Sequence, residues 1–137
     1  MIGSWWTVKV EARPEENLLW SRRANRTEDA IARGGKLFLT TERLLFLPSR
    51  FEASNGVGPH STERSSIISL RKQSRDVRSG GLFSGAARDR LGVRVDGQPD
   101  ELYVVPRVDS VISRLREALN AANDFGADSV EEDLPAR

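Results

Sequence analysis

The sequence predicts a mainly β fold with one C-terminal α-helix, arranged as a bent β-barrel or sandwich of six or seven antiparallel strands capped by the helix. Three observations lead to this prediction. Short apolar runs, several with strand-like alternation, recur between residues 3 and 105 and are separated by polar, Gly- and Pro-containing turns. Apolar residues then recur at helical spacing from residue 108 onward. The length of 137 residues suits one domain with its own core.

A β-hairpin is the clearest local feature. Lys36–Thr40 and Arg43–Pro48 are apolar runs separated only by Thr41 and Glu42, the spacing of a tight turn. Pro48 has no backbone N–H and ends the second strand. The remaining predicted strands cover residues 3–10, 17–24, 66–70 (with 71–78 as a polar edge extension), 90–95 and 101–105.

Polar segments connect these strands. Residues 22–29 read as a polar connection, and 51–63 and 79–85 read as loops rich in Gly and Ser. Three tryptophans, Trp5, Trp6 and Trp20, lie in the first two strand-like runs. We expect them to pack in the core or at a barrel end rather than to stack on nucleobases.

The C-terminal helix carries one apolar stripe, which suits it to close the open end of a barrel. Asp109 or Ser110 can cap its start. Residues 124–137 contain five acidic residues and one basic residue, and we expect a disordered acidic tail. The stripe consists of Val108, Val111, Ile112, Leu115, Leu119 and Ala122.

The hairpin motif Gly35-x-Leu37-x-Leu39-Thr40-x-x-Arg43-Leu44-x-Phe46 resembles the hallmark hairpin of GRAM domains, in their bacterial form. The resemblance is strongest over residues 35–48 and covers about 15–123, within a single expected domain of residues 1–123. It implies a pleckstrin-homology-like fold. It also implies non-catalytic binding, to phosphoinositides or other anionic lipids in some members and to proteins in others.

Positive charge is concentrated between residues 71 and 94, which hold seven basic and two acidic residues, although the whole chain carries a net charge of only +1. If 66–78 and 90–96 pair, these side chains converge and form an anion site. The alternative is an edge strand protected by charge against aggregation. The candidate anion- or lipid-binding residues are Arg71, Lys72, Arg75, Arg78, Arg88 and Arg90.

Leu82 and Phe83 lie in a Gly-rich loop inside this basic segment. They are candidates for a membrane-inserting tip with a basic collar. The favoured alternative is that they fold back over the core of the domain. The acidic tail could cover the basic segment and inhibit binding, in which case deleting residues 124–137 would strengthen anion binding.

Catalysis is not expected. The single histidine, His60, lies in a predicted loop, and the neighbouring Ser61 and Ser65 do not make a triad. No cysteine, metal-ligand cluster or nucleotide-binding motif is present in the sequence, so we expect no enzyme activity, metal or cofactor.

The N-terminal stretch has no signal-peptide pattern, and no apolar run is long enough to span a bilayer. We therefore expect a cytoplasmic protein that can lie on the inner face of the membrane. The main hypothesis is a module that docks on anionic lipid headgroups or a membrane surface. The rival is a protein-interaction scaffold that uses a sheet edge or the barrel end. Nucleic acid is not favoured as a partner.

Overall fold

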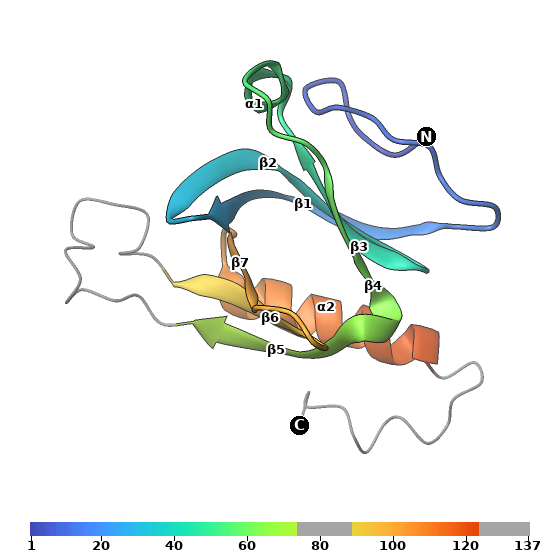
Figure 1. Ribbon diagram of the computed structural model, residues 1–137. Coiled ribbons are helices and arrows are strands. Elements are labelled where there is room, and N and C mark those ends of the chain that lie inside the picture. Colours follow the sequence, from blue (N-terminus) through green and yellow to red (C-terminus); the bar gives the residue numbers. More distant parts are fainter. Residues whose placement is uncertain (74–88, 124–137) are drawn as a thin grey trace.

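The computed structural model describes residues 1–73 and 89–123 (Figure 1). In these ranges seven antiparallel strands form one sheet in the order β4-β3-β2-β1-β7-β6-β5. The predicted mainly β fold with one C-terminal helix is confirmed. The strands are β1 (Leu18–Glu28), β2 (Ile31–Thr40), β3 (Arg43–Pro48), β4 (His60–Glu63), β5 (Ile67–Gln73), β6 (Arg90–Val95) and β7 (Glu101–Val104).

Two α-helices and one short 3-10 helix complete the described part of the chain. They are α1 (Arg50–Ser54), η1 (Arg64–Ser66) and α2 (Val108–Asn123). The C-terminal helix packs against β5, β6 and β1, as its apolar stripe predicts. It begins at Val108, so Asp109 and Ser110 both lie in its first turn and neither caps it, contrary to the prediction.

Strand β1 joins the two halves of the sheet. It pairs with β2 over nearly its whole length, but with β7 only at Asn25↔Val104 and Arg26↔Tyr103. The sheet therefore bends into one half of β1–β4 and another of β5–β7, with α2 lying across the second half (Figure 1).

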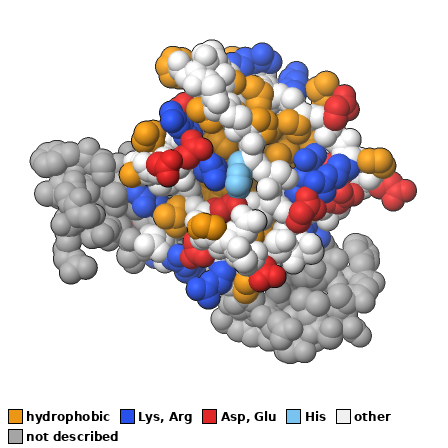
Figure 2. Space-filling view, viewed as in Figure 1, with side chains coloured by type: hydrophobic (Ala, Val, Ile, Leu, Met, Phe, Trp, Pro, Cys, Tyr) orange, Lys and Arg blue, Asp and Glu red, His pale blue; other side chains and the backbone are white. Residues whose placement is uncertain are grey.

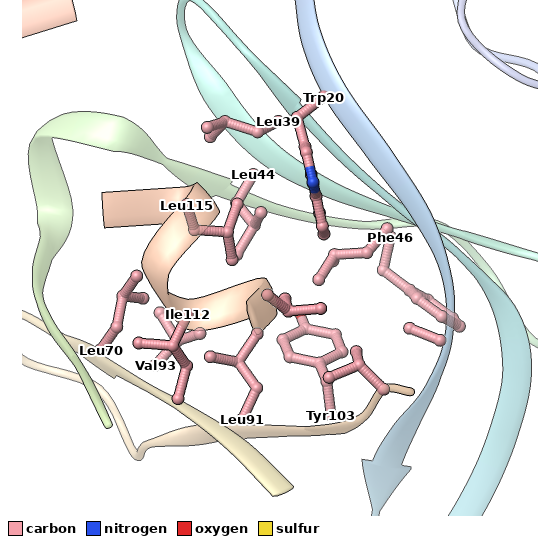
Figure 3. Close-up of a cluster of buried hydrophobic side chains, with 14 of the residues drawn as sticks. Trp20, Leu39, Leu44, Phe46, Leu70, Leu91, Val93, Tyr103, Ile112 and Leu115 are labelled. Atoms are coloured by element: carbon pink, nitrogen blue, oxygen red, sulfur yellow. The ribbon is translucent and has the colours of Figure 1, made fainter. Parts of the chain in front are cut away.

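The main core lies between these halves and the helix. Trp20, Leu39 and Leu44 from the first half face side chains from β5–β7 and α2 (Figure 3). The side chains that complete this contact include Leu70, Leu91, Val93, Tyr103, Ile112 and Leu115, all buried. Burial of this many large apolar groups is the main source of stability for the fold.

A second, smaller cluster lies on the other face of β2 and β3, where the N-terminal segment covers Phe38, Leu45 and Leu47. The prediction of a strand over residues 3–10 is wrong. These residues make only the isolated bridges Ile2↔Val10 and Thr7↔Ser49, and they pack across the sheet instead of joining it. Alternation of apolar residues therefore reflected packing and not strand pairing.

The predicted hairpin of β2 and β3 is confirmed, with Leu37 opposite Phe46 and a two-residue turn at Thr41 and Glu42. Gly35 has a steric reason to be glycine. A Cβ at this position would lie 2.3 Å from the carbonyl oxygen of Leu47. The close approach of the two strands thus excludes a larger side chain.

A buried carboxylate, Glu16, explains two polar residues of the hairpin motif. Its oxygens accept hydrogen bonds from Thr40 Oγ1 at 2.6 Å and from Arg43 Nε at 2.8 Å. The backbone N–H of Arg13 donates to the same carboxylate at 2.8 Å. Thr40 Oγ1 also accepts from the N–H groups of Glu42 and Arg43, so these contacts hold the turn in place.

Strands β1 and β2 continue past the predicted boundaries. Residues 22–28, predicted as a polar connection, belong to β1, and β2 begins at Ile31 instead of Lys36. Asp29 and Ala30 have φ of +50° and +69°, the left-handed pair that a tight type I′ turn requires. The dipeptide Asp-Ala lacks the glycine that normally marks such a turn.

The predicted loop over residues 51–63 is also corrected. It contains α1, whose cap Ser49 accepts a hydrogen bond from the N–H of Glu52, and it contains β4, which pairs with β3.

The prediction for the tryptophans holds only in part. Trp20 is buried and Trp6 half-buried, but Trp5 is 83% exposed. The 79–85 loop, the 74–78 extension and the 124–137 tail lie outside the described residues.

Candidate functional site

The basic segment folds in part as predicted, because β5 and β6 pair and place Arg71 opposite Gly92. However, two of its described cations, Arg71 and Lys72, are already paired with acidic residues. Arg71 Nη2 lies 2.5 Å from Asp100 Oδ2, and Lys72 Nζ lies 3.4 Å from Asp109 Oδ1. Arg71 also donates to Gln73. These two residues are therefore less available for an external anion than the sequence suggests.

Arg90 differs from its neighbours. The Nε atom of Arg90 is buried. Among residues 1–73 and 89–123, no acceptor lies within hydrogen-bond distance of this nitrogen. Five predicted site residues, namely Arg75, Arg78, Arg88, Leu82 and Phe83, lie outside the described residues. For these five, the roles in anion binding and membrane insertion stay predictions.

A pocket that the sequence did not indicate lies where β1 and the β7–α2 connection separate. Its volume is about 330 Å³, near the lower end of the range for small-ligand sites. Its wall is mostly apolar, with two arginines at the rim. The lining residues are Arg23, Ala24, Asn25, Asp89, Val104, Val105, Pro106, Arg107 and Val108.

Local backbone geometry forms this pocket. Backbone pairing of β1 with β7 stops at Asn25↔Val104, so the preceding residues of β1 diverge from the chain that leads into α2. Arg107 adopts a left-handed φ of +54°, which turns the chain from β7 into the helix. Its carbonyl accepts from the N–H of Val111, so the helix starts at the pocket wall.

Both arginines of the pocket are exposed and lack a carboxylate partner among the residues that the structure describes. The Arg23 guanidinium instead lies over the ring of Trp6, 5.4 Å from its centroid. Arg107 makes no ion pair or side-chain hydrogen bond within these ranges. The pocket thus combines two guanidinium groups and one carboxylate, that of Asp89, with an apolar wall. The two guanidinium groups leave an excess of positive charge, which suits an anionic group on an apolar carrier.

A second cluster of ionisable groups lies between the two halves of the sheet. Glu101 of β7 lies 2.6 Å from His60 Nε2 and accepts from Thr62 Oγ1 at 2.8 Å, both on β4. Tyr103 Oη donates to the other oxygen of Glu101 at 2.9 Å. Figure 2 shows the histidine, in pale blue, near the middle of the face between the halves.

The pKa of Glu101 reflects two opposed influences. Burial favours the neutral acid, but hydrogen bonds from His60, Thr62 and Tyr103 outweigh it and hold the pKa below its usual range. Burial, together with the nearby Glu101 charge, raises the pKa of Tyr103. The cluster thus contains an ionised carboxylate and a neutral phenol at ordinary pH, and it links β4 to β7 through side chains.

The shape of the described chain resembles solved structures of low sequence identity. A C-terminal domain of an unknown protein from Leishmania infantum matches with a TM-score of 0.58 at 19% identity, over 78% of this chain and 87% of that one. The Vps36 N-terminal PH domain matches with a TM-score of 0.54 at 14% identity, over 83% of each chain. The fold is pleckstrin-homology-like. No family model matches the sequence, and a search of curated proteins finds no significant match.

The pleckstrin-homology-like fold explains why sequence reasoning missed both clusters. Arg23 and Arg107 are brought together only when the last strand joins the first, and no local motif connects them. His60 was predicted in a loop, but in the structure it lies on β4 and its partner is Glu101. Nor did the sequence indicate that the carboxylates of Glu16 and Glu101 are nearly or fully removed from solvent.

Within residues 1–73 and 89–123, no group of three His, Cys, Asp or Glu side chains is placed to hold a metal ion. In the same ranges, neither helix is long and apolar enough to cross a bilayer.

Proposed function

We propose that this chain is a non-catalytic, GRAM-like binding module that docks on the phosphate-bearing headgroups of anionic lipids through the pocket between β1 and the β7–α2 connection. The observation that carries the proposal is the pair Arg23 and Arg107 at the rim of that pocket, without acidic partners among the described residues. In the predicted basic site, by contrast, Arg71 and Lys72 are each paired with an aspartate.

The chemistry of the pocket fits a phosphate group. A guanidinium presents paired N–H donors that match two phosphate oxygens, and such charge-assisted hydrogen bonds are worth about 1.5–3 kcal/mol each. Because both arginines are exposed, screening by salt reduces this contribution. The side-chain amide of Asn25 adds a neutral donor beside them.

The apolar wall fits the remainder of such a ligand. Val104, Val105, Pro106 and Val108 offer a surface for a glycerol backbone or the first carbons of an acyl chain. Arg88 precedes the pocket residue Asp89 in the chain, so Arg75, Arg78 and Arg88 stay candidates to extend the same anion-binding surface. In this proposal the protein is cytoplasmic and lies on the inner face of the membrane.

The absence of catalysis is part of the proposal and is supported by the position of His60. His60 and Thr62 point from β4 toward Glu101, so Ser61 between them lies on the opposite face of the strand and is exposed. Ser61 is therefore not placed beside the imidazole as a nucleophile would be. Its bond to Glu101 connects the two halves of the sheet.

Vesicle co-sedimentation tests the proposed function. We expect binding to vesicles of phosphatidylcholine with phosphatidic acid and none to phosphatidylcholine alone. Arg23→Ala and Arg107→Ala should each weaken binding by roughly tenfold, the equivalent of one charged hydrogen bond. Arg114→Ala is the matched control, because Arg114 is an exposed arginine on the outer side of α2, paired with Glu117.

Binding should also weaken as salt rises, since exposed charges are screened. Equal loss in Arg114→Ala and Arg23→Ala would mean that general positive charge, and not this pocket, attracts the membrane. No binding to either vesicle would refute the lipid proposal and favour the protein-interaction scaffold.

A further inference from the structure

Two large aromatic side chains stand on the surface where the N-terminal segment meets α1. Trp5 is 83% exposed and Phe51 is 73% exposed. Their segments are joined by hydrogen bonds, because Arg50 Nε donates to the carbonyl of Trp5 at 2.9 Å and the Arg50 N–H donates to that of Trp6 at 3.0 Å. The two segments also lie next to each other in Figure 1. We refer to Trp5, Arg50 and Phe51 as the aromatic ledge.

The ledge is held in place by its own local structure. Trp5 and Trp6 are the central residues of a tight turn closed by Ser4 and Thr7, where the N–H of Thr7 donates to the carbonyl of Ser4 at 3.1 Å. Thr7 is fully buried, and its hydroxyl accepts from the N–H of Ser4 at 2.9 Å. Trp5 is therefore exposed on an ordered turn.

The residues of the two segments that form the ledge carry basic charge. Residues 1–10 and 48–51 contain the basic residues Lys9 and Arg50 and no acidic residue, and the adjoining Glu52 is paired with Arg33. Figure 2 shows Lys and Arg side chains beside hydrophobic side chains along the upper rim of the molecule, with an acidic group at the right-hand end of that rim; α1 and the N-terminal segment lie along it in Figure 1. Exposed aromatic rings with a basic surround complement the interface of an anionic bilayer, where tryptophan is favoured.

One residue connects the ledge with the lipid pocket. Arg23 lines the pocket, and its guanidinium lies over Trp6, the neighbour of Trp5 in the turn. A membrane surface that offers a headgroup to Arg23 is thus close to the ledge as well. The aromatic side chains would then supply apolar burial that the exposed arginines cannot.

We infer that the aromatic ledge inserts into the interfacial region of an anionic membrane while the pocket holds a headgroup, an inference that rests on the proposed function. Trp5→Ala should weaken vesicle binding by roughly tenfold. It should leave binding of soluble glycerol 3-phosphate, followed by NMR titration, unchanged. Arg23→Ala should weaken both. Ile68→Ala, which truncates an exposed apolar residue on β5, is the control and should affect neither.

Insertion can be observed directly because the chain has no cysteine. An environment-sensitive NBD dye on Phe51→Cys should shift to shorter wavelength and brighten on phosphatidylcholine–phosphatidic acid vesicles. The same dye on Gln98→Cys, an exposed position in the β6–β7 turn, should not change. If the protein sediments with these vesicles but the dye on Phe51→Cys does not respond, the ledge inference is wrong and the proposed function stands. If the protein does not sediment, both are refuted.

Discussion

Replacement of Glu16 by glutamine tests the polar anchor of the β2–β3 hairpin. Glu16 is fully buried, and burial alone would raise its pKa. Hydrogen bonds from Arg43, from the backbone N–H of Arg13 and from Thr40 outweigh burial and lower the pKa from 4.5 to about 2. A difference of this size corresponds to about 3 kcal/mol of stability in the ionised protein. Glutamine keeps the shape but leaves Arg43, which is only 11% exposed, without a counter-charge.

The sign of the pH dependence follows from the lowered pKa. The ionised carboxylate contributes its full stabilisation above about pH 4.5, and the contribution is lost as pH falls through about 2. We therefore expect Glu16→Gln to lower the free energy of unfolding by about 3 kcal/mol near neutral pH. The difference between the two proteins should then shrink toward zero as the pH approaches about 2.

Urea unfolding followed by circular dichroism at a series of pH values measures this difference. Glu63→Gln is the control, because Glu63 pairs with Arg13 at the surface and an exposed ion pair contributes at most about 1 kcal/mol. The role assigned to the buried carboxylate would be refuted if the difference in unfolding free energy between wild type and Glu16→Gln did not change with pH. It would also be refuted if that difference were no larger than the one for Glu63→Gln.

Three further substitutions test the fold. Gly35→Ala should lower the free energy of unfolding in urea by about 1–3 kcal/mol, because the added Cβ would meet the backbone oxygen of Leu47. Gly34→Ala is the control and should be nearly neutral, because the atom nearest to its added Cβ is 3.5 Å away. Leu115→Ala should cost about 2–5 kcal/mol in thermal unfolding, since Leu115 joins α2 to the core. Glu101→Gln should lower the free energy of unfolding by about 1–3 kcal/mol and speed amide hydrogen exchange in β4. Unchanged exchange in β4 would contradict the role of Glu101 in linking β4 to β7.

Local signals made part of the fold predictable. The hairpin of residues 36–48 and the apolar stripe of α2 are set by neighbouring residues, and both were found at nearly the predicted positions. The β1–β2 turn was missed because Asp29 and Ala30 adopt left-handed φ without a glycine between the strands. That conformation is imposed by strand pairing on both sides and leaves little trace in the sequence.

The candidate sites depend on contacts between residues distant in the chain, which a single sequence does not reveal. Arg23 and Arg107 meet only because β7 returns to β1. In contrast, the clustering of basic residues near Arg71 was visible in the sequence, but the acidic residues Asp100 and Asp109 that offset them were not close in the chain. Charge counting along the chain therefore gave no sign that Arg71 and Lys72 have acidic partners.

The junction between β1 and β7 also has consequences for how the chain folds. Asn25 and Val104 are roughly 80 residues apart, a long-range pairing of the kind that slows folding. During synthesis β1–β4 can form hairpins early, but the apolar face that holds Trp20 and Phe46 stays uncovered until β5–β7 and α2 have emerged. A nascent or truncated chain that ends before Glu101 would expose this half-built core, so it should be aggregation-prone and a substrate for chaperones.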